Sequence, residues 1–140
     1  MTTPVVLDTN IVLDLWLYND PATPALLAAL TANEVQWVAT QVMRDELERV
    51  LAYPHIVQRM LKSNITAEHI LAQFDAHALI KPVAAKAPYT CKDPDDQKFI
   101  DLAVEQKATL YSKDKYVLAL RNRLARLGIE VRPQFVRPHP

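Results

Sequence analysis

The sequence predicts an α/β protein in which a central, mostly parallel sheet is covered by helices on both faces. Short runs of β-branched and apolar residues alternate with longer amphipathic segments along the chain. Half of the 140 residues are hydrophobic, which is enough for a real core and argues against disorder. The length fits one domain. We place this domain at residues 1–132 and assign residues 133–140 to a Pro-rich C-terminal tail.

The elements of the first half follow from apolar runs and from helix-start signals. Val5-Val6-Leu7 predicts a buried strand that closes on Asp8. Asn10 is the expected N-cap of a helix over 10–18, and Pro24 starts the next helix. The remaining expectations for this half are a helix over 24–32, a strand over 35–39, a helix over 41–53 that Pro54 closes, and helices over 55–62 and 66–79.

The second half returns to the alternation of strands and helices. Its expected elements are a short strand over 80–83, a loop over 84–95, a helix over 96–107, a strand over 109–112, a helix over 116–127 and a strand over 129–131. Gly128, the one glycine in the chain, stands where the C-cap of a helix favours glycine. Strands that alternate with helices predict a parallel sheet covered on both sides.

The charges balance overall but are unevenly distributed. Residues 1–50 carry seven acidic residues and two arginines, whereas residues 113–140 carry seven basic residues and two acidic ones. This asymmetry suits a protein that holds cations in one place and phosphates in another, although two oppositely charged solvated faces would give the same counts. A single cysteine excludes an intrachain disulfide, and no apolar run approaches the roughly 20 residues of a membrane span. We therefore expect a cytoplasmic protein with no membrane partner.

Two acidic residues follow strands of the predicted sheet. Asp8 ends the first strand and Asp114 lies just past the strand over 109–112. In an open parallel sheet, ligands bind at the carboxyl ends of the strands, so both side chains project toward one edge. Asp is also common after strands as a turn former or cap, and either residue alone fits that role.

A third acidic residue lies on the apolar side of a helix. At 100° per residue, Glu46 falls inside the arc made by the apolar residues of the helix over 41–53, one turn from both Met43 and Val50. Burying an unpaired carboxylate is costly, so a Glu on this side needs a partner, and a metal ion is one such partner. A Glu at the margin of the arc that reaches solvent or an arginine is the alternative.

The helix over 96–107 singles out Asp96. This residue lies near the middle of the apolar face at the N-terminal end of the helix, whereas Lys98 and Asp101 point away from that face. Asp93 and Pro94 also fit the N-cap and first position of a helix, and acids in the first turn favour its dipole. Those roles can coexist with metal binding.

Four carboxylates from four separated segments therefore have reasons to face one place. They are Asp8, Glu46, Asp96 and Asp114. Oxygen-only ligands suit a hard cation, Mg²⁺ or Mn²⁺, and not zinc. A cluster of acids beside phosphate is the arrangement of metal-assisted phosphodiester hydrolysis. The residues thus predict a divalent-metal site of the kind that assists phosphodiester hydrolysis.

The motifs that carry these acids resemble the PIN domain family. The similarity lies in Val6-Leu7-Asp8-Thr9-Asn10, Asp45-Glu46-Leu47, Asp93-Pro94-Asp95-Asp96-Gln97-Lys98-Phe99 and Leu110-Tyr111-Ser112-Lys113-Asp114. It covers about residues 4–132 and is closest to the branch of toxin components of bacterial toxin–antitoxin systems. One Asp-x-Asn motif is weak evidence, but four motifs in this order are specific. Ser112-Lys113-Asp114 departs from the Thr-Gly-Asp or Thr-Arg-Asp that is common in the family and keeps the hydroxyl.

The resemblance implies a three-layer α/β/α fold and a Mg²⁺- or Mn²⁺-dependent endoribonuclease that cleaves single-stranded RNA. Carried over by position, Asp8, Glu46, Asp96 and Asp114 match the acidic catalytic and metal-site positions. Asn10 and Ser112 match polar positions that hold those acids or a metal-bound water, and Asp93 is a further supporting residue. Asp93 and Asp95 lie near enough to Asp96 to be confused with it, and Asp96 is favoured because it alone lies on the core side of its helix. Proteins of this kind commonly act as toxins, are neutralised by a small antitoxin protein and form homodimers.

Other residues and other functions compete with these assignments. Lys113, Lys115 and Arg121 are candidate RNA contacts, although basic residues on an amphipathic helix often form a solvated face. Trp16 and Trp37 fit core or dimer contacts better than base stacking. The main alternative function is a catalytically silent RNA-binding or regulatory module with the same fold. An aspartyl-phosphate phosphatase would want a second Asp at position 10, and a receiver domain an Asp after the strand over 35–39; neither is present.

Overall fold

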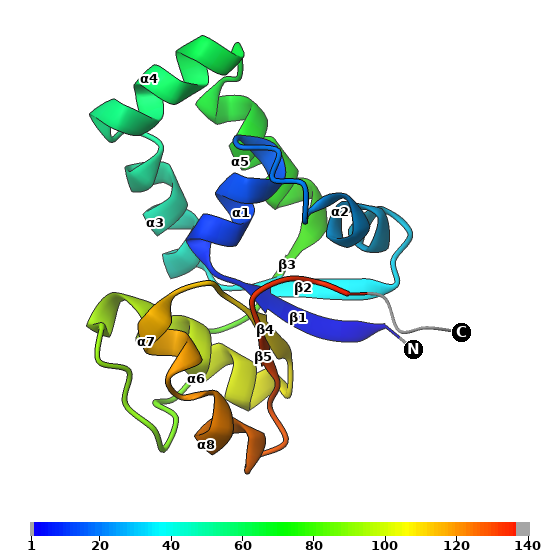
Figure 1. Cartoon of the computed structure of the whole chain (residues 1–140), viewed down its shortest axis with the longest axis vertical. Helices are drawn as coiled ribbons and strands as arrows, with labels where there is room; N and C mark the ends of the chain where they lie inside the picture. Colours follow the sequence, from blue (N-terminus) through cyan, green and yellow to red (C-terminus); the bar gives the residue numbers. More distant parts are fainter. Residues whose placement is uncertain (1, 137–140) are drawn as a thin grey trace.

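Five parallel strands form the central layer of the molecule (Figure 1). In the computed structural model, which describes residues 2–136, the strands lie in the order β3-β2-β1-β4-β5. Their bounds are β1 (Thr3–Leu7), β2 (Val35–Ala39), β3 (Ala78–Ile80), β4 (Thr109–Tyr111) and β5 (Val131–Arg132). Each neighbouring pair is parallel, as the alternation of strands and helices predicts.

Helices cover the sheet from both sides. Figure 1 shows α1, α2 and α5 above the sheet, α6, α7 and α8 below it, and α3 and α4 extending from the upper layer. The upper helices are α1 (Thr9–Trp16), α2 (Pro24–Thr31), α3 (Gln41–Val50), α4 (Pro54–Ser63) and α5 (Ala67–His77). The lower ones are the 3₁₀ turn η1 (Pro94–Asp96), α6 (Gln97–Gln106), α7 (Lys115–Leu118) and α8 (Arg121–Ala125). This is the predicted three-layer α/β/α sandwich.

The direction of the strand order reverses at β1. From β1 the chain passes outward to β2 and β3 on one side, then returns to β4 and β5 on the other. Leu7 pairs with Tyr111 in the register of β1 and β4, and the backbone N–H of Asp8 donates to the carbonyl of Tyr111 at 3.1 Å. A reversal of this kind leaves a crevice at the carboxyl ends of the two strands. Asp8 and Asp114 leave the sheet at this crevice.

The core contains an aromatic stack between the sheet and the upper helices. Trp16 of α1 and Trp37 of β2 are buried, with ring centroids 5.8 Å apart and planes tilted by 21°. The ring of His77 also stacks on Trp16, with ring centroids 5.9 Å apart. The ring of Phe74 meets that of Trp37 edge-on, with centroids 4.8 Å apart. Both tryptophans are thus core residues, as the sequence indicates.

Several predicted boundaries differ from the structure at the first helices. Asp8, and not Asn10, is the N-cap of α1, because the Asp8 carboxylate accepts the N–H of Asn10. The helix expected over 41–53 ends at Val50, and Pro54 begins α4. The strand expected over 80–83 is β3 at Ala78–Ile80, since the chain leaves the sheet once Lys81 N–H has bonded to the carbonyl of Ala39.

The predicted C-terminal helix is divided into two short pieces. The chain bends at Ala119 and Leu120 between α7 and α8, and Val117, Leu120 and Leu124 are all buried. Gly128 has φ 78°, and its N–H bonds to Ala125 while that of Ile129 bonds to Leu124. This is a Schellman cap, which confirms the expected role of the glycine.

The predicted tail begins with ordered contacts. Phe135 packs against the core, with its ring 6.1 Å from that of Tyr111 in β4. Residues 137–140 of the tail lie outside the described residues. Within residues 2–136, no helix is long and apolar enough to cross a membrane.

Candidate active site

Asp8 is a buried carboxylate held at the end of β1. It is 3% exposed, and its two oxygens have separate partners. Oδ1 accepts the backbone N–H of Asn10 at 2.7 Å, and Oδ2 accepts the hydroxyl of Ser112 at 2.6 Å. The Asn10 side chain is exposed, so in this structure the residue supports Asp8 through its backbone. Asp8 can face the crevice in a fixed orientation because both oxygens are anchored.

Ser112 connects the two strand ends. Its side chain is fully buried after β4, donates to Asp8 and accepts the backbone N–H of Asp114 at 3.1 Å. Asp114 is the N-cap of α7 and accepts the N–H groups of Tyr116 at 2.8 Å and Val117 at 3.3 Å through Oδ1. Its second oxygen, Oδ2, receives none of these bonds. One hydroxyl thus sets the relative position of two acids that are 106 residues apart in the sequence.

Asp93 and Asp96 reach the same place from the start of α6. Asp93 is the N-cap of η1 and accepts the N–H of Asp95 at 3.0 Å. Asp96 precedes α6, yet its side chain makes no capping hydrogen bond. One carboxylate oxygen each from Asp93, Asp96 and Asp114 lie within 4.8 Å of one another, and all three residues are half-buried. The structure therefore brings Asp93, expected only as a supporting residue, into the centre of the cluster.

The cluster is electrostatically unfavourable without a cation. Burial, followed by the negative charges of Asp114, Asp8 and Asp93, raises the pKa of Asp96 to about 7, while Lys98 opposes this shift. Burial also raises the pKa of Asp8; its hydrogen bonds to Ser112 and Asn10 act in the opposite direction. Like charges at this distance disfavour simultaneous ionisation. A divalent cation among these oxygens would relieve that repulsion.

Glu46 faces the site but has its own partners. The hydroxyl of Thr9 donates to Oε1 at 2.6 Å, and the ammonium of Lys98 pairs with Oε2. Glu46 is absent from the three-carboxylate cluster found among the described residues. Lys98, which helical periodicity directs away from the apolar face, instead spans from α6 to α3 with its side chain 21% exposed. Its long flexible stem lets the ammonium return to the crevice, which periodicity alone does not anticipate.

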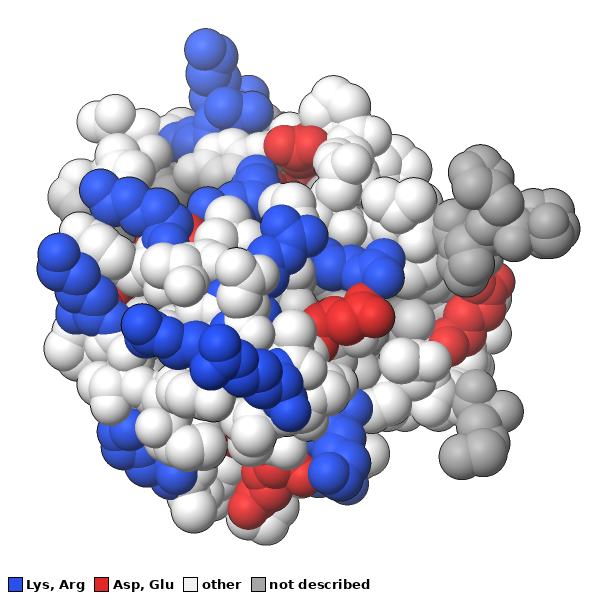
Figure 2. Space-filling view, turned by 60° about the horizontal axis from the view of Figure 1, so that its bottom comes forward, with Lys and Arg blue, Asp and Glu red and all other residues white. Residues whose placement is uncertain are grey.

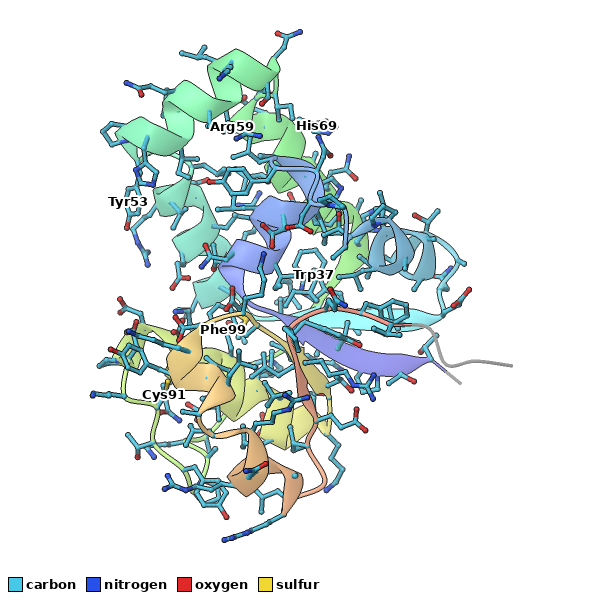
Figure 3. The ribbon with its side chains drawn as sticks, in the orientation of Figure 1. Trp37, Tyr53, Arg59, His69, Cys91 and Phe99 are labelled. Atoms are coloured by element: carbon cyan, nitrogen blue, oxygen red, sulfur yellow. The ribbon has the colours of Figure 1, made fainter. Side chains whose placement is uncertain are left out.

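A pocket of about 270 Å³ opens between the upper and lower layers at this crevice. Asp8, Glu46 and Asp96 line it, together with Thr9 and Asn10. In Figure 3, Phe99 marks the lower side of this region, next to α6, and Tyr53 marks the upper side, where α3 ends. Glu46 thus shares a pocket with Asp8 and Asp96, and of these three only Asp96 belongs to the carboxylate cluster found among the described residues.

The irregular segment before Asp93 is fastened by the first turns of α6. Gln97 accepts the N–H of Cys91 at 2.6 Å and donates to the carbonyl of Tyr89 at 3.0 Å. Asp101 accepts the N–H of Ala87 at 2.8 Å, so it holds this loop although periodicity directs it away from the core. The helix that starts at Asp96 therefore also positions the approach to Asp93. Polar residues at i and i+4 on a helix beside a Pro-containing loop are the signal for this role.

The candidate RNA-binding residues have different surroundings. The ammonium of Lys113 pairs with Asp14, and Asp20 lies 3.6 Å away, so its charge is largely compensated. Lys115 is exposed and lines a hollow together with Asp114. Arg121 lines a separate hollow beside β5. Of the three, Lys115 is the residue best placed beside the acids.

Basic side chains gather on the lower face of the molecule. Figure 2 shows that Lys and Arg outnumber Asp and Glu on the face that is turned forward from the bottom of Figure 1. The exposed basic residues carried by the lower helices and their loops are Lys86, Lys92, Lys107, Lys115, Arg121, Arg123 and Arg126. Such a face attracts polyanions even though the chain has no net charge.

A family model described as PIN domain matches residues 4–114, which is more than half of the chain. The match begins within β1 and ends at Asp114, so it includes all the acids described above. A search of curated proteins found no match.

Proposed function

The chain belongs to the PIN domain family, and we propose that it is a metal-dependent endoribonuclease that hydrolyses phosphodiester bonds of single-stranded RNA. PIN domains are generally nucleases, and the carboxylate cluster is compatible with a divalent metal. The observation that carries the proposal is the convergence of Asp93, Asp96 and Asp114 within 4.8 Å, next to the hydrogen-bonded Asp8.

The residues of the cluster fit Mg²⁺ or Mn²⁺. They offer only carboxylate oxygens, the ligands of hard cations, and no His or Cys takes part in the cluster found among the described residues. Asp96 and Asp114 would hold the ion, with Asp8 and Asp93 as further oxygen donors. The bound ion would neutralise phosphate charge and favour ionisation of an attacking water.

The protein supplies orientation and a contact for phosphate. Ser112 holds Asp8 and Asp114 in a common frame, so their oxygens do not have to reorganise when substrate binds. The raised pKa of Asp96 belongs to the metal-free site, and a bound cation would lower it. Lys115 beside Asp114 is positioned to contact a phosphate of the RNA strand.

The resemblance to toxin components supports a second, finer proposal, namely that the nuclease is the toxin of a toxin–antitoxin pair. A small antitoxin protein would then be its partner, and the nuclease would form a homodimer. Production of the chain alone should slow bacterial growth, and production of Asp96→Asn should not. Equal growth of both strains at equal protein levels would contradict the toxin role without affecting the nuclease proposal.

The nuclease proposal is tested with purified protein and labelled oligonucleotides. We expect Mg²⁺ or Mn²⁺ to support cleavage of single-stranded RNA in preference to duplex RNA, and EDTA to stop it. Asp8→Asn and Asp96→Asn should each lose at least about 100-fold in rate, since each removes several kcal/mol of charge stabilisation.

Asp95→Asn is the matched control for that experiment. Asp95 is an exposed acid in the same turn as Asp96 and lies outside the cluster. Its variant should retain activity near wild type. Equal residual cleavage by wild type and Asp96→Asn would identify a contaminant and end the nuclease proposal. Tight RNA binding without any cleavage would favour the silent binding module.

A further inference from the structure

The pocket beside the acids has a second half made of aromatic side chains, of which Tyr53 and His55 are exposed. Tyr18, Tyr53 and His55 line it opposite Asp8 and Asp96. These rings come from the chain just after α1 and from the junction between α3 and α4. Acidic side chains and aromatic rings thus line the same pocket.

The ring of Tyr53 is available to a ligand. Tyr53 is 48% exposed, and its ring contact among the described residues is with His55, at 6.2 Å and a tilt of 33°. That geometry leaves a face of Tyr53 uncovered. Tyr53 is also the N-cap residue of α4 but makes no side-chain capping bond, so capping does not explain the side chain. Tyr18, by contrast, already has the guanidinium of Arg59 over its ring at 5.1 Å.

We propose that Tyr53, flanked by His55, is a stacking subsite for an unpaired base next to the phosphate that the acids engage. The inference rests on the proposed nuclease function and adds a reason for single-strand preference. Unpaired bases stack on aromatic side chains in a sequence-tolerant way, whereas bases inside a duplex cannot. A volume of about 270 Å³ lies near the lower limit of small-molecule sites, roughly 300 Å³, which suits one nucleotide and not a duplex.

The polar atoms in the pocket favour a nucleotide over an apolar peptide. Thr9, Asn10 and Glu46 line the same space, and although Thr9 and Glu46 bond to each other, an apolar side chain would desolvate these polar groups without adding a bond. A nucleotide offers donors and acceptors on its base and sugar to meet these groups. The chemistry of both halves of the pocket is thereby used by one ligand.

The experiment measures binding and stacking separately from cleavage. A single-stranded RNA oligonucleotide carries 2-aminopurine at one position at a time, and its emission is followed on titration with full-length protein and Ca²⁺ in place of Mg²⁺. We expect strong quenching at one or two adjacent positions. Tyr53→Ala should abolish that quenching and weaken binding about 5- to 100-fold, the usual effect of removing one stacked base.

Two further variants separate stacking from folding. Tyr53→Phe keeps the ring and should retain both quenching and affinity. Leu61 lies in α4 outside the pocket and is 76% exposed. Leu61→Ala should therefore bind RNA and quench its emission as wild type does. An abasic nucleotide at the quenched position should weaken binding to wild type and leave binding to Tyr53→Ala unchanged. The abasic comparison in wild type alone decides the question if Tyr53→Ala does not fold.

The results distinguish the inference from the function on which it rests. Quenching that depends on Tyr53 in a protein that never cleaves RNA would support the subsite and contradict the nuclease. Cleavage by wild type with equal binding by Tyr53→Ala and Leu61→Ala would support the nuclease and overturn the subsite. Quenching at no position would also overturn it.

Discussion

The acidic side chains on the lower and upper walls of the crevice have different surroundings. On the lower wall, Asp93, Asp96 and Asp114 converge, and the pKa of Asp96 is raised to about 7 by burial and by its acidic neighbours. On the upper wall, Glu46 is matched by the hydroxyl of Thr9 and the ammonium of Lys98. Both walls are half-buried, so solvation alone does not explain the difference.

The lower acids lie close to like charges, whereas the upper acid, Glu46, has a cationic partner in the same chain. The protein surrounds the lower acids with like charge, which a divalent cation would offset under the proposed function. The upper acid is already neutralised by an amino group of the same chain. We infer that Glu46 orients Lys98 and Thr9 at the edge of the site, while the lower acids and Asp8 bind the ion.

The largest expected effect is on metal affinity. Asp96→Asn should weaken Mn²⁺ binding at least about 100-fold, because it removes the charge of a ligand, whereas Glu46→Gln should weaken it only about 10-fold, the lower end of what changes around a ligand shell cost. Isothermal titration of Mn²⁺ into each metal-free protein measures both values. A loss of equal size in the two variants would place Glu46 among the ligands and remove the contrast between the walls.

The next effect concerns the hydroxyl that joins two of the acids. Ser112→Ala leaves the buried Oδ2 of Asp8 and the N–H of Asp114 without their shared partner. We expect metal affinity to fall about 10-fold and stability by about 1–3 kcal/mol. Ser112→Thr, which keeps the hydroxyl, is the control. Urea denaturation and Mn²⁺ titration give the two quantities; unchanged metal affinity in Ser112→Ala would show that the frame does not depend on this residue.

Stability of the metal-free protein should change in opposite directions at the two walls. Lys98→Met leaves Glu46 half-buried without its cationic partner. We expect the free energy of unfolding to fall by about 1–2 kcal/mol, between the values for exposed and buried ion pairs. Asp96→Asn removes one of several like charges and should add about 1 kcal/mol after allowance for solvent screening, or roughly 4 °C in melting temperature. Calorimetry in EDTA measures both. Stabilisation by Lys98→Met would contradict the pairing of Glu46.

The smallest effect is on the pH dependence of folding. The folded-state pKa of Asp96, about 7, lies above the ordinary value of 3.8, so between these values the folded state binds more protons than the unfolded state. Stability of the metal-free protein should therefore fall as pH rises from about 4 to 7. The melting temperature of wild type in EDTA should drop over this interval by a few degrees more than that of Asp96→Asn. Parallel curves of melting temperature against pH for the two proteins would mean that the pKa of Asp96 is not raised in the folded state.

The strands and the strand-end acids were predictable from local pattern. Val5-Val6-Leu7 has no polar residue before Asp8, so the strand and its end are evident from the sequence. The break between α7 and α8 was not predictable, since Leu, Val and Arg spacing over 116–127 fits one helix, and only packing on β5 decides otherwise.

The limits of prediction at the site have a physical cause as well. Periodicity gives the direction in which a Cβ leaves a helix, which was sufficient for Asp96, whose short side chain ends near its own backbone. It fails for Lys98, because four methylene groups carry the ammonium back across the crevice. The place of Asp93 beside Asp96 depends on a loop fastened by Gln97, a contact that no repeating pattern encodes.

The stacked rings of Trp16, Trp37 and His77 give the core an intrinsic spectroscopic signal. Indole emission depends on the polarity around the ring, and both indoles of the chain lie in that one buried stack. Trp16 ends the helix that begins at Asp8, so a shift of α1 on cation binding would disturb the exciton coupling between the two rings. Near-ultraviolet circular dichroism of the unlabelled protein would then report both unfolding and events at the crevice.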